Sequence, residues 1–127
     1  MGETLSILVV DDNPSMVKTL VDILGIKGFE VHAAYSGAEA LAVLQGQRVD
    51  ILLTDVIMPD MDGVALYRAT QKTNPNLVTI LMTAYAADEI IQQGLEEGIQ
   101  TVLTKPLDID LMLAMFSAFK KLFAKAS

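Results

Sequence analysis

The stretch from Val49 to Gly63, which reads VDILLTDVIMPDMDG, constrains the possible fold more than any other part of the chain. Its apolar run Ile51-Leu52-Leu53 has no polar alternation, which is typical of a strand that helices cover on both faces. The run ends at Asp55. Because open α/β folds bind ligands at the carboxyl edge of the sheet, an acid at the end of a central parallel strand predicts a functional site.

Strand and helix patterns alternate along the rest of the chain. Besides the strand that begins at residue 51, apolar or alternating segments predict strands at residues 6–10, 30–34, 77–83 and 101–104. Helical spacing predicts helices at residues 14–27, 37–46, 63–72, 86–97 and from 109 towards 125. Gly28 is the expected left-handed stop of the first helix. The side chains expected to cap helix starts are those of Asn13, Ser36, Asp62 and Asp108.

A helix between each pair of strands leaves room for right-handed crossovers between parallel strands. The first and third strands are the most apolar, so we place them at the centre, and we place the second and fifth at the edges. The expected fold class is α/β. It is a doubly wound, five-stranded parallel sheet with the order 2-1-3-4-5, in a flavodoxin-like, three-layer α/β/α arrangement.

Five polar residues lie at or just after the ends of four of these strands. Asp11 and Asp12 come after the first strand and Asp55 ends the third, while Thr83 and Lys105 lie at the ends of the fourth and fifth. With the expected order, the switch point lies between the first and third strands. We therefore expect the five side chains to meet at the carboxyl edge of the sheet.

Three carboxylates at one place repel one another and partly protonate unless a cation joins them. Ligation by oxygen alone favours a hard ion, and a shallow site that keeps several waters favours Mg²⁺ over Ca²⁺. With the Lys105 ammonium and the Thr83 hydroxyl, such a site has the positioning and charge neutralisation that phosphoryl transfer needs. Asp55 is the expected phosphoryl acceptor.

These residues also carry a resemblance to a known family. The match rests on short motifs at strand ends, taken in order: Asp11-Asp12, Asp55 with Met58-Pro59 and Asp62-Gly63, Thr83-Ala84, and Lys105-Pro106. Over about residues 6–123, the chain resembles the receiver domains of two-component response regulators, a CheY-like family. The resemblance implies that Asp55 accepts a phosphoryl group from the phosphohistidine of a sensor histidine kinase or from a phosphotransfer protein. The domain would then switch conformation and control a partner or an output domain.

The resemblance assigns further roles around the acceptor. It implies that Asp12, Asp55 and the backbone carbonyl of Ile57 bind Mg²⁺ directly, and that Asp11 acts largely through water. It also implies a cis peptide bond at Lys105-Pro106.

In the family, the lysine holds a phosphoryl oxygen and the threonine swings towards the phosphoryl group, roles that fall here to Lys105 and Thr83. An aromatic residue three before the lysine usually follows this movement, but Val102 stands there in this chain. In the family, the residues two positions after the acceptor and two positions after the threonine usually flank the path of the water molecule that attacks the phosphoryl group. They are the bulky Ile57 and Tyr85. We therefore expect slow loss of the phosphoryl group.

Other interpretations of the same residues stay open. A magnesium-dependent phosphatase with an aspartyl nucleophile carries its nucleophile after the first strand and a second acid two residues on, but Asp11 and Asp12 are adjacent and Asn13 holds that later place. A degenerate receiver that only binds partners is disfavoured because no site residue is missing, yet Val102 keeps it open. Asp60 is interpreted as a loop residue rather than a metal ligand.

Composition limits the class of protein. The formal charge of −7 argues against direct binding of nucleic acid by this domain, and a chain without cysteine has no disulfide framework. No apolar run is long enough to span a membrane, and the first six residues lack the features of a secretory signal. We expect a cytoplasmic signalling protein, not a metabolic enzyme. Residues 1–127 would form one domain, with its core at about 6–123 and no output domain after the last helix.

The last predicted helix has more apolar surface than one packing face needs. The stripe expected to face the sheet consists of Leu111, Met115, Ala118 and Leu122. A second stripe beside it consists of Met112, Phe116, Phe119 and Phe123. This surplus predicts a partner surface, with a homodimer through the fourth helix, fifth strand and fifth helix as one form of it. Coverage of the second stripe by neighbouring elements is the alternative.

Overall fold

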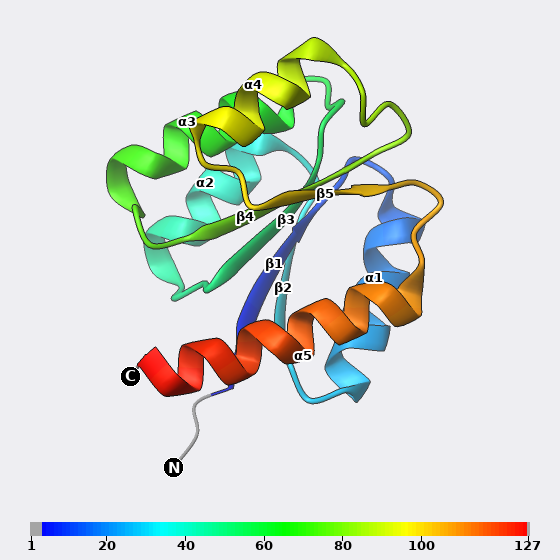
Figure 1. Cartoon of the computed structure of the whole chain (residues 1–127), viewed down its shortest axis with the longest axis vertical. Coiled ribbons are helices and arrows are strands. Elements are labelled where there is room, and N and C mark those ends of the chain that lie inside the picture. The colour runs from blue at the N-terminus through cyan, green and yellow to red at the C-terminus, as the bar shows by residue number, and fades with distance from the viewer. Residues whose placement is uncertain (1–3, 127) are drawn as a thin grey trace.

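The computed structural model describes residues 4–126. Residues 1–3, part of the segment examined for a secretory signal, and residue 127 lie outside the described part. Strands and helices alternate along the described chain (Figure 1). In order they are β1 (Ser6–Val10), α1 (Pro14–Ile26), β2 (Glu30–Ala34), α2 (Gly37–Gly46), β3 (Ile51–Asp55), α3 (Gly63–Thr73), β4 (Val78–Thr83), α4 (Glu89–Glu97), β5 (Thr101–Thr104) and α5 (Ile109–Ala126).

The strands form one parallel sheet in the order β2-β1-β3-β4-β5, which confirms the predicted fold. At its centre, Leu8 of β1 lies beside His32 of β2 on one side and Leu52 of β3 on the other. Every residue of β1 and β3 is buried, whereas most residues of β2 and β5 keep some exposure. The most continuous apolar runs therefore mark the central strands, because helices cover both faces of them.

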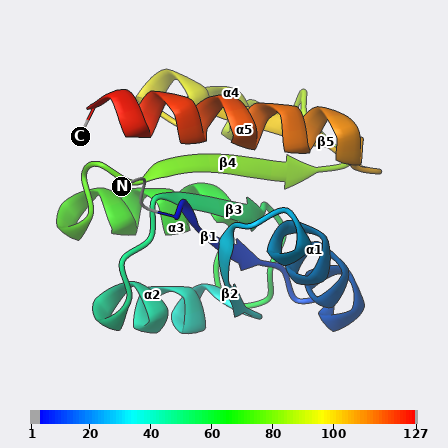
Figure 2. The ribbon, with the colours of Figure 1, turned by 90° about the horizontal axis from the view of Figure 1, so that it is seen from below.

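Helices cover both faces of the sheet and produce three layers (Figure 1). Figure 2 shows the strands one beside the next, from β5 to β2. α1 and α5 lie on one face, where Leu20 and Phe116 belong to the same core cluster as Val9. α2, α3 and α4 lie on the other face, over two smaller clusters. The chain runs outward from β1 to β2, then in the opposite direction from β3 to β5. The switch point between β1 and β3 is where such folds bind ligands.

The ends of most helices follow the predicted signals. Asn13, Ser36, Asp62 and Asp108 each accept a hydrogen bond from a backbone N–H in the following turn. Gly28 follows α1 with a φ of +92°, which glycine adopts at little cost. These local interactions could be predicted from the sequence because donor and acceptor are close along the chain.

The start of α4 was predicted wrongly. The helix begins at Glu89, three residues later than expected, because Ala86 lies in a turn in which Asp88 N donates to Tyr85 O over 3.1 Å. The Ala86 carbonyl accepts a hydrogen bond from the side chain of Gln92, and Asp88 makes no side-chain cap. This end of α4 is therefore held by few interactions.

The other end of α4 is fastened to α3. The Tyr67 hydroxyl donates to the Glu97 carbonyl oxygen over 2.8 Å, and the Arg68 guanidinium forms a two-pronged ion pair with the Glu97 carboxylate. Gly98 ends the helix with a φ of +128°, and a Cβ there would lie 2.5 Å from the Tyr67 hydroxyl. The two ends of α4 thus differ in how firmly they are held.

The face of α5 that packs on the sheet was also predicted wrongly. Leu111 and Leu122 are 56% and 59% exposed, whereas Met112 and Phe116 are fully buried. Phe116 packs edge-on against Phe29, with 6.1 Å between the ring centroids, and this contact turns the aromatic stripe inward. Although α5 is the longest helix, no helix within residues 4–126 is both long and apolar enough to cross a membrane.

Gly63, the first residue of α3, lies against the backbone that carries Asp55. A Cβ at Gly63 would lie 2.6 Å from the Asp55 carbonyl oxygen and 3.2 Å from the Val56 Cα. Since backbone atoms yield only when the segment shifts, we expect Gly63→Ala to lower the free energy of unfolding by about 1–3 kcal/mol in urea titrations.

Gly25→Ala is the matched control, because a Cβ on this α1 residue would meet no atom within 4 Å. Alanine has the higher helix propensity, so this variant should gain up to about 1 kcal/mol in the same titration. Equal unfolding midpoints for Gly63→Ala and the parent protein would contradict the steric argument.

Candidate functional site

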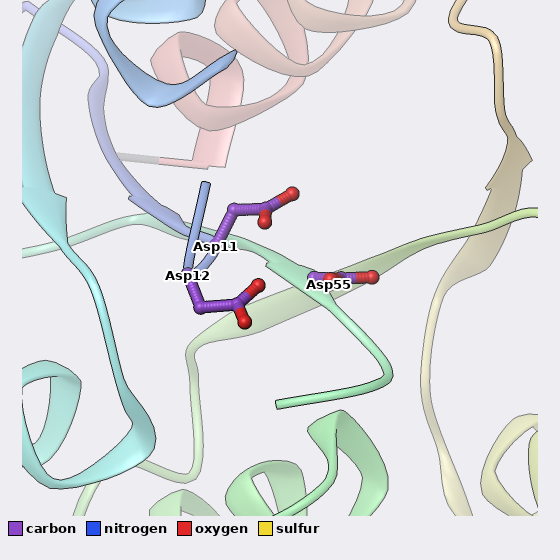
Figure 3. Close-up of side chains that lie close together, drawn as sticks. All are labelled: Asp11, Asp12 and Asp55. Carbon is purple, nitrogen blue, oxygen red and sulfur yellow. The ribbon is translucent and has the colours of Figure 1, made fainter. Parts of the chain in front are cut away.

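The acids predicted to meet lie side by side, Asp11 and Asp12 just after β1 and Asp55 at the end of β3 (Figure 3). One carboxylate oxygen from each of Asp11, Asp12 and Asp55 lies within 4.8 Å of the other two. Asp11 and Asp55 are buried, and Asp12 is exposed. Two carboxylates of the cluster are therefore buried inside the fold, and the third lies at the surface.

Lys105 reaches this cluster from the end of β5. Its Nζ donates to Asp11 Oδ2 over 3.0 Å and lies 3.3 Å from Asp55 Oδ1. The Lys105 N–H donates to the Thr83 carbonyl oxygen, and the following bond to Pro106 is cis, as predicted. One ammonium group thus joins two buried carboxylates from different strands.

The charges of the site shift the pKa of two groups. Burial raises the pKa of Asp55 above its ordinary value, the Asp11 carboxylate raises it further, and Lys105 only partly offsets the rise. Burial acts to lower the pKa of Lys105, but its contacts with Asp11 and Asp55 outweigh this and raise it. Lys105 therefore stays charged at neutral pH, while ionisation of Asp55 costs free energy in the folded state.

Thr83 ends β4, the strand next to β3, and its side chain is buried. Its Oγ1 accepts a hydrogen bond of 3.0 Å from the Tyr85 N–H. The hydroxyl thus ties the strand end to the loop that leads to α4. The Tyr85 side chain itself is 59% exposed.

The loop between β3 and α3 is fixed at several points. The Val56 N–H donates to the Met82 carbonyl oxygen, and the Val56 carbonyl oxygen accepts from Gly63 N over 2.8 Å. Met58 is buried in the core cluster below α2, whereas Ile57 between these anchors is 61% exposed. The predicted metal ligand Ile57 therefore lies at the surface of an otherwise anchored loop.

One contact of this loop was missed from the sequence. The Asp60 carboxylate accepts hydrogen bonds from the N–H groups of Gly37 and Ala38 at the start of α2. These two hydrogen bonds lower the pKa of Asp60. The partners are 23 and 22 residues away, so no local signal marks the contact.

The donors in the cluster fit a hard divalent cation. All three side chains offer carboxylate oxygens, and among the described residues the cluster includes no histidine. Two buried acids next to one ammonium leave the carboxylates in excess, which a further positive charge would offset. This pocket, formed by Asp11, Asp12 and Asp55, has the chemistry of a metal site of oxygen ligands.

A family profile described as "Response regulator receiver domain" matches residues 7–117. The chain belongs to this family. The receiver domain is 36% identical over 98% of its length to the sensor histidine kinase RcsC of Escherichia coli. It is 37% identical over 84% of its length to the transcriptional regulatory protein GlrR of Escherichia coli strain K12. The receiver domain spans only 13% and 24% of the lengths of these two proteins.

Solved structures agree with the family. A CheY-like response regulator receiver domain protein from Methanospirillum hungatei JF-1 superposes with a TM-score of 0.91 at 27% identity, over 98% of this chain and 100% of that one. The chemotaxis response regulator CheY4 of Vibrio cholerae has a TM-score of 0.83 at 29% identity, over 91% and 98%. The chain is thus a receiver domain of the kind found in two-component signalling systems.

The raised pKa of Asp55 predicts how its replacement affects stability. The folded domain holds the Asp55 proton more tightly than the unfolded chain does, so stability falls as pH rises from the ordinary value of 3.8 through the raised pKa. In metal-free buffer we expect Asp55→Asn to stabilise the receiver domain at about pH 7.5, with a smaller gain at about pH 4.5. Urea unfolding at both pH values measures the difference.

Asp22→Asn provides the control, since Asp22 is an exposed carboxylate that pairs with Lys18 on α1. Its effect should stay below about 1 kcal/mol at either pH, as for other exposed pairs. An Asp55→Asn protein that is less stable than the parent at about pH 7.5 would show that the sign is wrong.

Proposed function

We propose that this receiver domain accepts a phosphoryl group on Asp55 from the phosphohistidine of a sensor histidine kinase or of a phosphotransfer protein, in a reaction that requires Mg²⁺. The observation that supports this most directly is the pairing of the buried Asp55 with Lys105 over 3.3 Å, next to two further carboxylates. The membership of the receiver family supports it independently.

In the proposed step, an Asp55 carboxylate oxygen attacks phosphorus as the bond between phosphorus and the donor imidazole nitrogen breaks. The electron pair of that bond leaves with the imidazole. Burial and the neighbouring Asp11 raise the pKa of Asp55, which makes its ionised form more nucleophilic. Lys105 holds its positive charge beside the acceptor and would stabilise the negative charge of the phosphoryl oxygens.

The residues that would hold Mg²⁺ are Asp11, Asp12, Asp55 and the backbone carbonyl of Ile57. The three carboxylates fit this role by their spacing and by their excess of negative charge. When bound, the ion would neutralise charge on the transferred phosphoryl group.

Phosphorylation would act on the loop after β4. In the proposed switch, the Thr83 hydroxyl, which now accepts a hydrogen bond from the Tyr85 N–H, moves to donate one to a phosphoryl oxygen, and this alters the loop between β4 and α4. Val102 is partly buried against the core cluster that contains Leu81 and Ile91. Because valine has no aromatic ring, this position lacks the aromatic side chain that moves inward in the family. The response would therefore depend on the loop and on the lightly held start of α4.

The partners and setting stay proposals. We propose a cytoplasmic domain that occupies residues 1–127, docks with its phosphodonor and does not itself bind nucleic acid, since its formal charge is −7. A homodimer through α4, β5 and α5 also stays a prediction. On α5, its contacts would now include the exposed Leu111 and Leu122 in place of the more buried aromatic stripe.

Intact mass spectrometry tests the proposed reaction. After incubation with Mg²⁺ and acetyl phosphate, we expect the protein to gain the mass of one phosphoryl group. The gain should disappear in Asp55→Asn and when EDTA removes the metal, because the acceptor or the charge neutralisation is then missing.

Lys105→Ala should label more slowly while still binding Mg²⁺, because it removes an ammonium group and no metal ligand. A parent protein that gains no mass from either acetyl phosphate or a phosphorylated phosphotransfer protein would contradict the proposal and favour a binding module. Continuous release of inorganic phosphate from a phosphate ester would instead favour the aspartyl phosphatase.

The lifetime of the phosphorylated form tests the role of Tyr85. The Tyr85 and Ile57 side chains are exposed on the loops that follow β4 and β3, in keeping with a role in limiting the approach of water. We expect Tyr85→Ser to lose the phosphoryl group faster than the parent, as followed by mass after the donor is removed. The matched variant Tyr35→Ser changes an exposed tyrosine after β2 and should leave the decay rate unchanged. Equal decay rates for Tyr85→Ser and the parent would exclude this role.

A further inference from the structure

The contact between Asp60 and α2 fastens the loop after β3 to a separate element. Asp60 Oδ1 accepts a hydrogen bond of 3.1 Å from Gly37 N, and Asp60 Oδ2 accepts one of 2.9 Å from Ala38 N. Each carboxylate oxygen thus binds one of the first N–H groups of the helix, which have no partner within the helix. A negative charge is also favourable at a helix N-terminus.

A packing contact accompanies these hydrogen bonds. A Cβ built on the buried Gly37 would lie no more than 3.0 Å from the Cγ, Sδ and Cε atoms of Met61. The glycine therefore leaves room for the Met61 side chain to lie directly on the start of α2. Asp60 and Met61 hold the loop to the helix by a polar contact and an apolar one, which together we call the loop clamp.

The loop clamp completes the anchoring of the segment that carries Ile57. On one side of Ile57, the Val56 backbone is bound to Met82 and Gly63. On the other side, Met58 is buried, and Asp60 follows two residues later with its contact to α2. Without the clamp, the chain between Met58 and the cap of α3 would lose its attachment to α2.

We propose that Asp60 is a positioning residue for the metal site: through the start of α2, it holds the loop that carries Ile57, whose carbonyl oxygen would bind the ion together with Asp12 and Asp55. This inference rests on the proposed function, because it concerns the magnesium site of the same reaction. A metal ligand that is held before binding does not have to be ordered when the ion binds, so affinity is higher.

A purely structural cap is the competing explanation. Ser36 Oγ already accepts a hydrogen bond from the Glu39 N–H, so α2 has a cap of its own. If Asp60 merely added a second cap, its loss would lower stability and leave the affinity for Mg²⁺ unchanged. The two explanations therefore differ in a quantity that can be measured without phosphoryl transfer.

The test is a titration with MgCl2 at fixed ionic strength, followed by NMR on isotopically labelled receiver domain. We expect Asp60→Ala to raise the Kd for Mg²⁺ by about tenfold, the lower end of the loss when a supporting partner of a metal site is removed. Asp60→Asn keeps one carbonyl oxygen as acceptor and should lose less. The amide signals of Gly37 and Ala38 report directly whether the clamp is broken.

Two further variants separate position from charge. Gly37→Ala changes no charge, but it displaces Met61 and should also raise the Kd. Asp88→Asn removes one negative charge from the residue just before α4, which makes no side-chain cap, and should leave the Kd unchanged.

An unchanged Kd in a folded Asp60→Ala protein would overturn the inference, and so would an equal rise in Asp88→Asn, which would identify charge alone as the cause. A parent protein with no magnesium-dependent shifts would count against the magnesium site of the proposed function itself. These failures are distinguishable because in the first two the parent protein binds Mg²⁺, whereas in the third it does not.

Discussion

The contacts of Lys105 with Asp11 and Asp55 are the interaction on which the site depends. They join the end of the edge strand β5 to the ends of the two central strands. The Lys105 backbone is held in turn by the Thr83 carbonyl oxygen. Because both acids are buried, either one without the ammonium would be an uncompensated charge inside the protein. The sheet therefore places a cation from its edge strand next to acids at the ends of its central strands.

The buried acids that give the site its chemistry also lower the stability of the fold. Burial and a neighbouring acid make the charged form of Asp55 unfavourable, so the apolar core must offset the cost. Part of that core lies in the strand that carries Asp55, since every residue of β3 is buried. The elements around the site are held unequally: the end of α4 at Glu97 is fastened to α3, while its start at Glu89 has no side-chain cap from Asp88.

Much of the fold and most of the site were predictable because they depend on local pattern and on strand ends. Apolar runs predicted the strand order, and Asp11, Asp12, Asp55 and Lys105 meet as expected. The sequence could not predict contacts that side chains make after folding. The face of α5 was ambiguous because its apolar arc is wide, and packing of Phe116 on Phe29 decided it. The contact from Asp60 to α2 spans more than twenty residues and leaves no local pattern.

The bond between Lys105 and Asp11 joins residues 94 positions apart, near opposite ends of the domain. A chain in which β5 has not yet joined the sheet has the acids but lacks their ammonium partner. The cluster is therefore complete only when β5 lies in the sheet beside β4. Loss of β5 from the sheet would leave Asp11 and Asp55 without the cation that offsets their charge, so the edge of the sheet and the site are lost together.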